Sequence, residues 1–336
     1  VITGGIILNG GGDNNNDLSG AGNNDSLLEL RTIGNTAGSD VRLNGAVTLG
    51  SDVLITTNGD TGLDTQQAFA GDITFTHDAA VNSATGERND LELRSGAGTV
   101  NVNANMGVTD ALQTLVVSDT TGVVTFGTAD TITAAQDGGP VTLIRTFGEI
   151  NLGKGTADND VITSGIVLNA GGVNDGSDTT LELRTIGDTT DSDVRINGFV
   201  TLESDVLITT NGDDGLDTNQ SFAGDILLTH SAVVNSATGE TRDFTLRSGT
   251  GTISLNANIG ATDAVQSLTI SDTTGTVTIG AFDTANQTLT EDLGPVTLIR
   301  SVGAIDFGAG TGDTDDDDVI TGGIILNGGG DNNNDL

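Results

Sequence analysis

Residues 319–336 read VITGGIILNGGGDNNNDL, and residues 1–18 read the same letters. A less similar copy begins at Val161 and reads VITSGIVLNAGGVNDG. Unlike units therefore alternate, and one full period covers residues 1–318. Because self-similarity at a fixed spacing is typical of repeat architectures, we predict one continuous solenoid. It would consist of a first unit (residues 1–160), a second unit (residues 161–318) and the start of another first unit (residues 319–336).

The repeat also predicts how this chain relates to a larger protein. The chain starts with Val1 and stops within a unit, which leads us to expect a segment of a longer tandem array. An intact protein whose two ends happen to match is the alternative.

Within a unit, the sequence pattern is one of short strands. Residues 39–65 align without gaps on residues 192–218, and 23 of the 27 positions are identical. Apolar and polar residues alternate in short runs that are bounded by Gly, Asn, Asp or Ser, which is typical of β-strands. In the first unit we expect one strand that ends before Asn9 and others at Leu28–Arg31, Asp40–Asn44, Val47–Leu49, Val53–Thr57, Ile73–Thr76, Val100–Asn103, Leu115–Val117, Val123–Phe126, Val141–Ile144 and Glu149–Leu152.

The composition and the net charge of the chain argue against several classes of function. The 336 residues include 47 acidic and 11 basic side chains, which gives a formal net charge of −36. Such a charge repels phosphate, so it argues against nucleic-acid binding and against anionic membrane surfaces. The absence of cysteine excludes disulfides and thiolate metal sites. No apolar run approaches the roughly 18 residues that a bilayer span requires, so no membrane insertion is expected.

The sequence predicts an all-β fold, for which a sandwich, a propeller and a solenoid are the candidates. Nine Phe and no Trp or Tyr are too few for a sandwich core, and a propeller would repeat every 40–50 residues. A parallel β-helix needs thin rows of Val, Ile and Leu, with Gly, Asn and Asp at its corners. The 50 glycines and 35% hydrophobic residues match that need. At about 25–30 residues per coil, the full period would span about 50–60 Å of rod.

Several stretches share the pattern G-x-[IV]-x-[LFV], as in Gly45–Leu49, Gly71–Phe75, Ala97–Val102 and Thr121–Gly127. This pattern resembles the β-strand repeats of very large bacterial surface proteins, of which the filamentous-haemagglutinin-like adhesins are the best-known family. The resemblance covers nearly the whole chain. It implies a right-handed parallel β-helix that is secreted and used at the cell surface, and it implies no catalytic residues.

Clusters of aspartate are the candidates for chemistry. Asp158 and Asp160 lie in a Gly-containing stretch before the second unit, and Asp313, Asp315 and Asp318 lie in one before the third copy. Both stretches resemble a single copy of the Gly/Asp turn that gathers carboxylates around Ca²⁺. Like charges this close repel one another unless they are screened or bound. These five residues are our candidate calcium ligands, in two separate stretches, and solvated turns that keep the rod soluble are the alternative.

Other ionisable side chains recur once per unit, as His77 does at His230. A catalytic residue is more often single, so the recurrence indicates stacking or charge balance, and no enzyme is expected. The two histidines are expected to be exposed at corners and too far apart to share a metal. Glu29 and Arg31 lie two positions apart on one strand face, which predicts a surface ion pair.

The expected function is therefore structural: a segment of a very large secreted repetitive protein that forms a rod or fibre, as an adhesin stalk or an extracellular filament. Expected partners are further copies of the array, end to end or side by side, and a host or neighbouring cell surface. A calcium-dependent adhesive or binding module is the main alternative, followed by an ice-binding solenoid and a carbohydrate-active β-helix. Apart from calcium, no cofactor is expected.

Overall fold

The computed structural model describes residues 5–10, 27–33, 38–57, 71–128, 139–154, 161–170, 180–187, 192–210, 212, 224–280, 296–308, 320 and 322–326. In this part of the chain the regular structure is entirely β, with 26 strands and no helix. It follows that the described residues contain no helix that could cross a membrane.

The strands lie on three sides of a coil, which we call the first, second and third faces. The first face contains β1 (Ile6–Leu8), β4 (Val47–Leu49), β7 (Val81–Ser83), β12 (Leu143–Thr146), β15 (Leu181–Thr185), β18 (Val206–Thr209), β21 (Asp243–Arg247), β23 (Ser267–Ile270) and β25 (Ile305–Phe307). The second face contains β2 (Leu28–Arg31), β5 (Val53–Thr56), β8 (Leu91–Arg94), β10 (Leu115–Ser118), β13 (Ile150–Lys154), β16 (Val194–Ile196), β19 (Ile226–Leu228), β22 (Ile253–Leu255), β24 (Val277–Ile279) and β26 (Ile324–Leu326). The third face contains β3 (Val41–Leu43), β6 (Ile73–Phe75), β9 (Val100–Val102), β11 (Val124–Phe126), β14 (Ile162–Leu168), β17 (Gly198–Leu202) and β20 (Val234–Ser236).

Isolated bridges continue the faces where no full strand forms. Met106 pairs with Val81 of β7 and with Ile144 of β12, so it joins the two parts of the first face. Ile259 pairs with Val234 of β20 and with Ile299, so these residues extend the third face in the same way.

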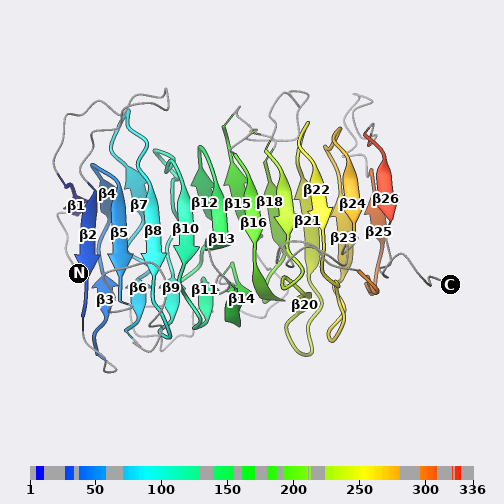
Figure 1. Cartoon of the computed structure of the whole chain (residues 1–336), viewed down its shortest axis with the longest axis horizontal. Helices are drawn as coiled ribbons and strands as arrows, with labels where there is room; N and C mark the ends of the chain where they lie inside the picture. The colour runs from blue at the N-terminus through cyan, green and yellow to red at the C-terminus, as the bar shows by residue number, and fades with distance from the viewer. Residues whose placement is uncertain are drawn as a thin grey trace, which may run out of the picture.

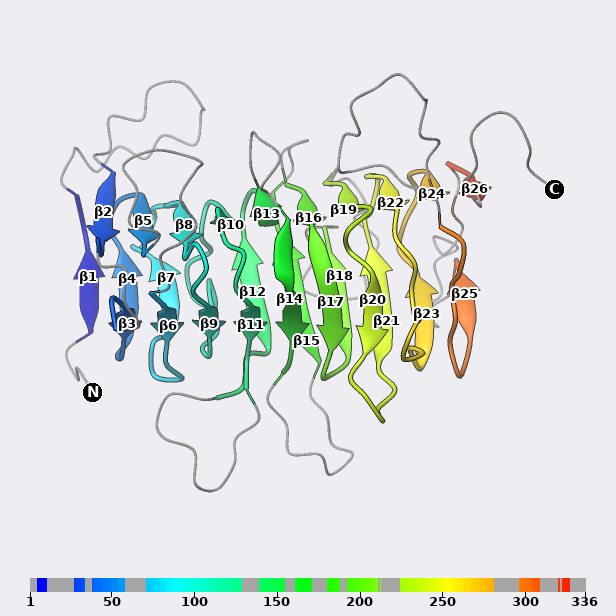
Figure 2. The ribbon, with the colours of Figure 1, turned by 60° about the horizontal axis from the view of Figure 1, so that its bottom comes forward.

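The chain winds from one face to the next, and every pairing between the described strands is parallel. For example, β5, β6 and β7 lie on the second, third and first faces, and β8 then returns to the second face and pairs with β5. Figures 1 and 2 show the strands side by side along the long axis, from β1 near the N-terminus to β26 near the C-terminus. The protein is therefore an elongated parallel β-helix, and the predicted fold class is confirmed.

Alternation along each strand fills the interior of the coil. In β8, Leu91 and Leu93 are fully buried, whereas Glu92 between them faces outward and is partly exposed. Parallel register places similar residues on top of one another: Leu93 pairs with Ile55 of one neighbouring coil and with Val117 of the other. Each face thus contributes rows of aliphatic side chains to the interior.

These rows join into one hydrophobic cluster that extends from Leu8 to Val296. Complete burial of a Val, Leu or Ile side chain contributes about 1.5–3 kcal/mol. The largest fully buried side chains are Phe75, Phe126 and Phe244. Because the interior is only as wide as facing aliphatic rows, the coil needs few aromatic residues.

The coils are longer on average and less regular than the sequence predicts. In a short coil of the first unit, Thr114 bonds to Asp90, and the two are 24 residues apart. In a long coil of the second unit, Thr276 bonds to Gly322, and these two are 46 residues apart. Residues added between strands lengthen a coil without adding rise along the axis.

β26 comes 28 strand positions after β1, when the bridge residues Met106, Ile259 and Ile299 are counted. Three positions per coil give about nine coils over the 318-residue period, or about 34 residues per coil. The predicted length of about 25–30 residues per coil is therefore too short, and the predicted span of about 50–60 Å is too long, since about nine coils give about 45 Å.

In the first unit, one predicted strand is displaced and two observed strands are absent from the predicted set. The strand expected at Val141–Ile144 begins at Leu143, as β12. The side-chain Oδ1 of Asn105 accepts hydrogen bonds from the N–H groups of Thr142 and Leu143 at 2.7 and 3.0 Å, so a side chain replaces strand pairing there. The two strands missing from the expected set are β7 and β8.

Candidate functional site

The candidate calcium ligands Asp158, Asp160, Asp313, Asp315 and Asp318 lie outside the described residues. Within the described ranges, no group of three or more His, Cys, Asp or Glu side chains could hold a metal ion. Calcium binding at the five aspartates therefore stays a prediction from the sequence.

The other polar residues singled out in the sequence lie on the surface. His77 follows β6 and His230 follows β19, and both are exposed, as predicted. His77 Nε2 lies 3.1 Å from the carboxylate of the adjacent Asp78. The predicted ion pair between Glu29 and Arg31 is also present. These side chains do not converge on a common site.

A partly buried polar cluster lies where β8 and β10 end on the second face. Arg94 Nη2 lies 2.7 Å from Glu92 Oε1, and Arg94 Nε donates to Ser118 Oγ at 3.2 Å. Ser118 Oγ donates to Glu92 Oε1 at 2.6 Å, and Asp119 Oδ2 lies 3.8 Å from Arg94 Nε. We call these four residues, Glu92, Arg94, Ser118 and Asp119, the first arginine corner. In it Glu92 is the principal partner of the arginine.

The second unit contains the equivalent cluster on the first face, with one different residue. Thr245, Arg247, Ser271 and Asp272 form the second arginine corner, in which Thr245 takes the place of the glutamate. Arg247 Nε lies 3.1 Å from Ser271 Oγ and 3.1 Å from Asp272 Oδ2. The arginine that loses its glutamate is thus paired more closely with the aspartate of the neighbouring coil.

Both corners depend on an aspartate with unusual backbone geometry. Asp119 and Asp272 have φ angles of 43° and 45°, in the left-handed region that aspartate tolerates better than most residues. Residues in such conformations cost about 1–3 kcal/mol and require support from their surroundings. Both aspartates belong to the sequence SDTTG, at residues 118–122 and 271–275. The repeated SDTTG could have marked these corners from the sequence, although its geometry could not be predicted.

Aspartates that precede strands bond to the next coil. In the first unit, Asp52 Oδ1 accepts from the N–H of Asp90 at 2.9 Å, and Asp90 Oδ1 accepts from the hydroxyl of Thr114 at 2.7 Å. Burial raises the pKa of the Asp90 carboxyl above its ordinary value. The hydrogen bond from Thr114 opposes this rise in pKa, and the charge of Asp52 adds to it.

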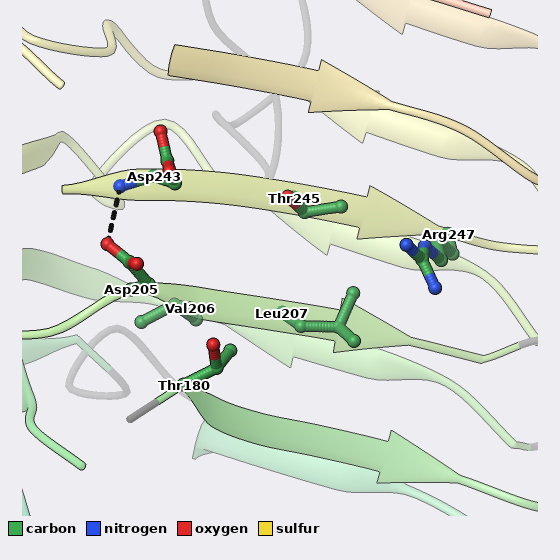
Figure 3. Close-up of a pocket in the computed structure, with 7 residues that line it drawn as sticks. All are labelled: Thr180, Asp205, Val206, Leu207, Asp243, Thr245 and Arg247. Carbon is green, nitrogen blue, oxygen red and sulfur yellow. Dashed lines mark hydrogen bonds between the residues drawn. The ribbon is translucent and has the colours of Figure 1, made fainter. Parts of the chain in front are cut away.

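A shallow cavity of about 230 Å³ lies over β18 and β21 on the first face, in the second unit. We call it the groove. Figure 3 shows Asp205 and Asp243 at one end of these strands, Arg247 at the other end and Leu207 between them. Asp205 accepts a hydrogen bond from the N–H of Asp243 at 2.9 Å. Burial raises the pKa of Asp205, the N–H of Asp243 opposes this rise, and the charge of Asp243 adds to it.

The equivalent surface of the first unit has different residues. Leu54, the counterpart of Leu207, is only 7% exposed, although it faces outward from β5. Glu92 pairs in register with Leu54, as Thr245 pairs with Leu207 in the second unit. Glu92, which is held by Arg94, thus stands at the position where the second unit has the shorter Thr245.

The polar groups of these sites hold successive coils together. Arg94 and Arg247 both reach from one coil to the serine of the next. The carboxylates of Asp52 and Asp205 likewise accept backbone N–H groups of a neighbouring coil. Since a charged partner makes such hydrogen bonds stronger than neutral ones, the arrangement indicates a mechanical role for these side chains.

Comparisons with protein-family models, with curated proteins and with solved structures found no match to this chain. The fold and its side chains therefore carry the functional proposal.

Proposed function

We propose that this chain is a structural segment of a very large secreted repetitive protein, which forms a rod or fibre at the cell surface. The observation that carries the proposal is the uninterrupted stack, since the second face alone pairs ten strands in parallel from β2 to β26. A stack in which each coil touches only its neighbours can be lengthened without a change in cross-section. That property suits an adhesin stalk or an extracellular filament.

Ladders of aspartate between coils support this role. Asp40 Oδ1 accepts from the N–H of Asp72 at 2.9 Å, and Asp72 Oδ1 accepts from the N–H of Thr99 at 2.7 Å. The second unit has an equivalent bond, from the N–H of Asp225 to Asp193 Oδ1 at 2.7 Å. Each carboxylate satisfies a backbone donor of the neighbouring coil, so these bonds resist separation of the coils along the axis.

The charge of the chain suggests how its partners are arranged. A formal net charge of −36 makes parallel rods repel one another at low ionic strength. Continuation by further copies along the axis is therefore favoured over close packing side by side. In this proposal the rod carries its acidic surface into the extracellular space, where it contacts a host or neighbouring cell surface, and it does not bind nucleic acid or enter a membrane.

Two measurements test the proposal. X-ray scattering from the purified chain should show a rod of constant cross-section, and antibodies raised against the chain should label the surface of intact cells that produce it. A compact particle in solution would overturn the rod, and labelling that appears only after cell lysis would overturn the location.

A further inference from the structure

Equivalent strands of successive units lie on different faces of the rod. The motif at β1 recurs at β14 and again at β26, as IIL, IVL and IIL. However, β1 lies on the first face, β14 on the third face and β26 on the second face. Other equivalent pairs behave in the same way: β5 and β18 both read VLIT, and they lie on the second and first faces.

The number of strand positions in a unit explains this change of face. With Met106, Ile259 and Ile299 counted as positions on their faces, β14 comes fourteen positions after β1, and β26 comes fourteen after β14. Each coil has three positions, one for each face. Fourteen positions are four complete coils and two further strands. The next unit therefore begins on a different face, one third of a turn around the axis from the start of the previous unit.

We propose that this offset turns equivalent surfaces of successive units around the axis of the rod, so that they face three directions in turn. The number of units then sets the direction in which anything attached to the rod points. The inference rests on the proposed rod function. At a rise of about 4.8 Å per coil, each unit advances about 22 Å along the axis.

The two arginine corners illustrate the offset. The first corner lies on the second face, at the ends of β8 and β10, and the second corner lies on the first face, at the ends of β21 and β23. The groove follows the second corner onto the first face. By the same rule, the groove of a following period would lie on the second face. A partner that binds one unit would thus be held around the rod and not along one side of it.

The offset also has a mechanical consequence. Coils differ in length, as the short coil from Asp90 to Thr114 and the long coil from Thr276 to Gly322 show. If every unit placed its irregular coils on the same side, any bend they cause would add up along the array. Rotation by one third of a turn per unit distributes these coils around the axis, so three units cancel the bend.

Chemical cross-linking in the full chain tests the offset at the boundary between units. The natural chain contains no cysteine, so a thiol reagent can react only with the two cysteines that are introduced. Thr125→Cys with Val167→Cys places the thiols on register partners of β11 and β14, at the strand spacing of about 4.8 Å. Arg145→Cys with Val167→Cys is the matched control, because these residues would be register partners only if β14 continued the first face above β12.

With a short bifunctional thiol reagent, we expect the Thr125/Val167 pair to cross-link within the chain and the Arg145/Val167 pair not to do so. The reverse pattern would overturn the offset while leaving the rod intact. Loss of the rod itself would appear separately, as a compact scattering profile of the unsubstituted chain.

A second measurement reports direction around the axis. Gold labels at Thr74→Cys and Leu227→Cys would mark equivalent positions of β6 and β19, on the third and second faces. For labels one third of a turn apart, electron micrographs should show them on opposite sides of the midline in about two-thirds of side views. Labels at Thr74→Cys and Thr201→Cys share the third face, so they should lie on the same side. Same-side labels in both variants would overturn the proposal.

Discussion

The two arginine corners keep the same arginine but give it different principal partners. In the first unit, Arg94 is held by Glu92, and Asp119 stays 3.8 Å from its Nε. In the second unit the glutamate is absent, and Arg247 Nε lies 3.1 Å from Asp272. One hydrophobic cluster continues through the interior of both units. Residues that face outward can therefore differ between the units while the hydrophobic interior continues.

The largest effect should come from the glycine that ends SDTTG in each unit. A Cβ at Gly122 would lie 1.9 Å from the carbonyl oxygen of Gly98, and one at Gly275 would lie 1.9 Å from that of Gly251. Backbone of the neighbouring coil cannot move aside without breaking pairing. We predict that Gly122→Ala and Gly275→Ala each lower the free energy of unfolding by about 3 kcal/mol or more, measured with urea.

Two glycines in open space provide the control for that prediction. Gly86 and Gly239 have φ angles of 82° and 84°, and a Cβ added to either would meet nothing within 4 Å. Gly86→Ala and Gly239→Ala should cost only the left-handed backbone strain, about 1–2 kcal/mol. If all four variants lost the same free energy of unfolding, the close approach between coils would not be the reason that Gly122 and Gly275 must be glycine.

The second prediction separates the two corners. Asp119→Asn and Asp272→Asn keep a residue that tolerates the left-handed conformation, and they remove only the charge. Because Asp272 lies closer to its arginine, Asp272→Asn should cost about 1–2 kcal/mol of unfolding free energy, and Asp119→Asn less than about 1 kcal/mol. A double-mutant cycle with Arg247→Gln measures the pair. Equal costs for the two aspartates would contradict the difference that we draw between the corners.

Exchange of the residue that distinguishes the corners tests the cause of the groove. Thr245→Glu should pair with Arg247, fill the groove and stabilise the fold by up to about 1 kcal/mol. Glu92→Thr is the reciprocal variant, which should expose Leu54 and destabilise by a similar amount. Urea unfolding gives the energies, and crystal structures of the two variants show which surface is open. If the groove stayed open in Thr245→Glu, another residue would have to explain it.

The fold could be predicted from the sequence because it depends on short-range patterns. The alternation of apolar and polar residues and the corner residues that bound it lie close together in the chain. The stretch Leu28–Arg31 shows its inward and outward residues directly, and β2 has the predicted bounds. Coil length could not be predicted in this way, since residues added between strands leave the alternation unchanged. The two missing strands differ in pattern: β7 (Val81–Ser83) has one apolar residue, whereas β8 repeats the LELR of β2 and could have been found by comparison.

The groove was beyond sequence reasoning for a different reason. Its lining includes Leu207 and Thr245, which are far apart in the chain and are recognised as neighbours only when the register of β18 and β21 is known. The candidate calcium ligands Asp158, Asp160, Asp313, Asp315 and Asp318 rest on local charge density, and they lie outside the described residues. Short-range patterns thus predicted the strands, and the site required pairing between coils.

The smallest effect concerns Asp90, the aspartate that precedes β8. Burial raises the pKa of Asp90 above its ordinary value of 3.8, so the folded chain binds this proton more tightly than the unfolded chain does. Ionised Asp90 therefore lowers stability, and the cost develops as the pH rises from about 4 through the raised pKa. Asp90→Asn retains an acceptor for Thr114 and removes the charge. We predict that it stabilises the fold by less than about 1 kcal/mol at pH 7 and not at all at pH 3.

Unfolding of the natural chain and of Asp90→Asn, measured at several pH values between 3 and 7, checks this sign. Asp205→Asn is the matched variant in the second unit, where burial also raises the pKa of the carboxyl. Asp205 is less deeply buried than Asp90, so its gain should be the smaller of the two. A variant that is less stable than the natural chain at pH 7 would mean that the charged form of Asp90 contributes more through its hydrogen bond than it costs by burial, and the aspartate ladders would then stabilise the rod through their charge.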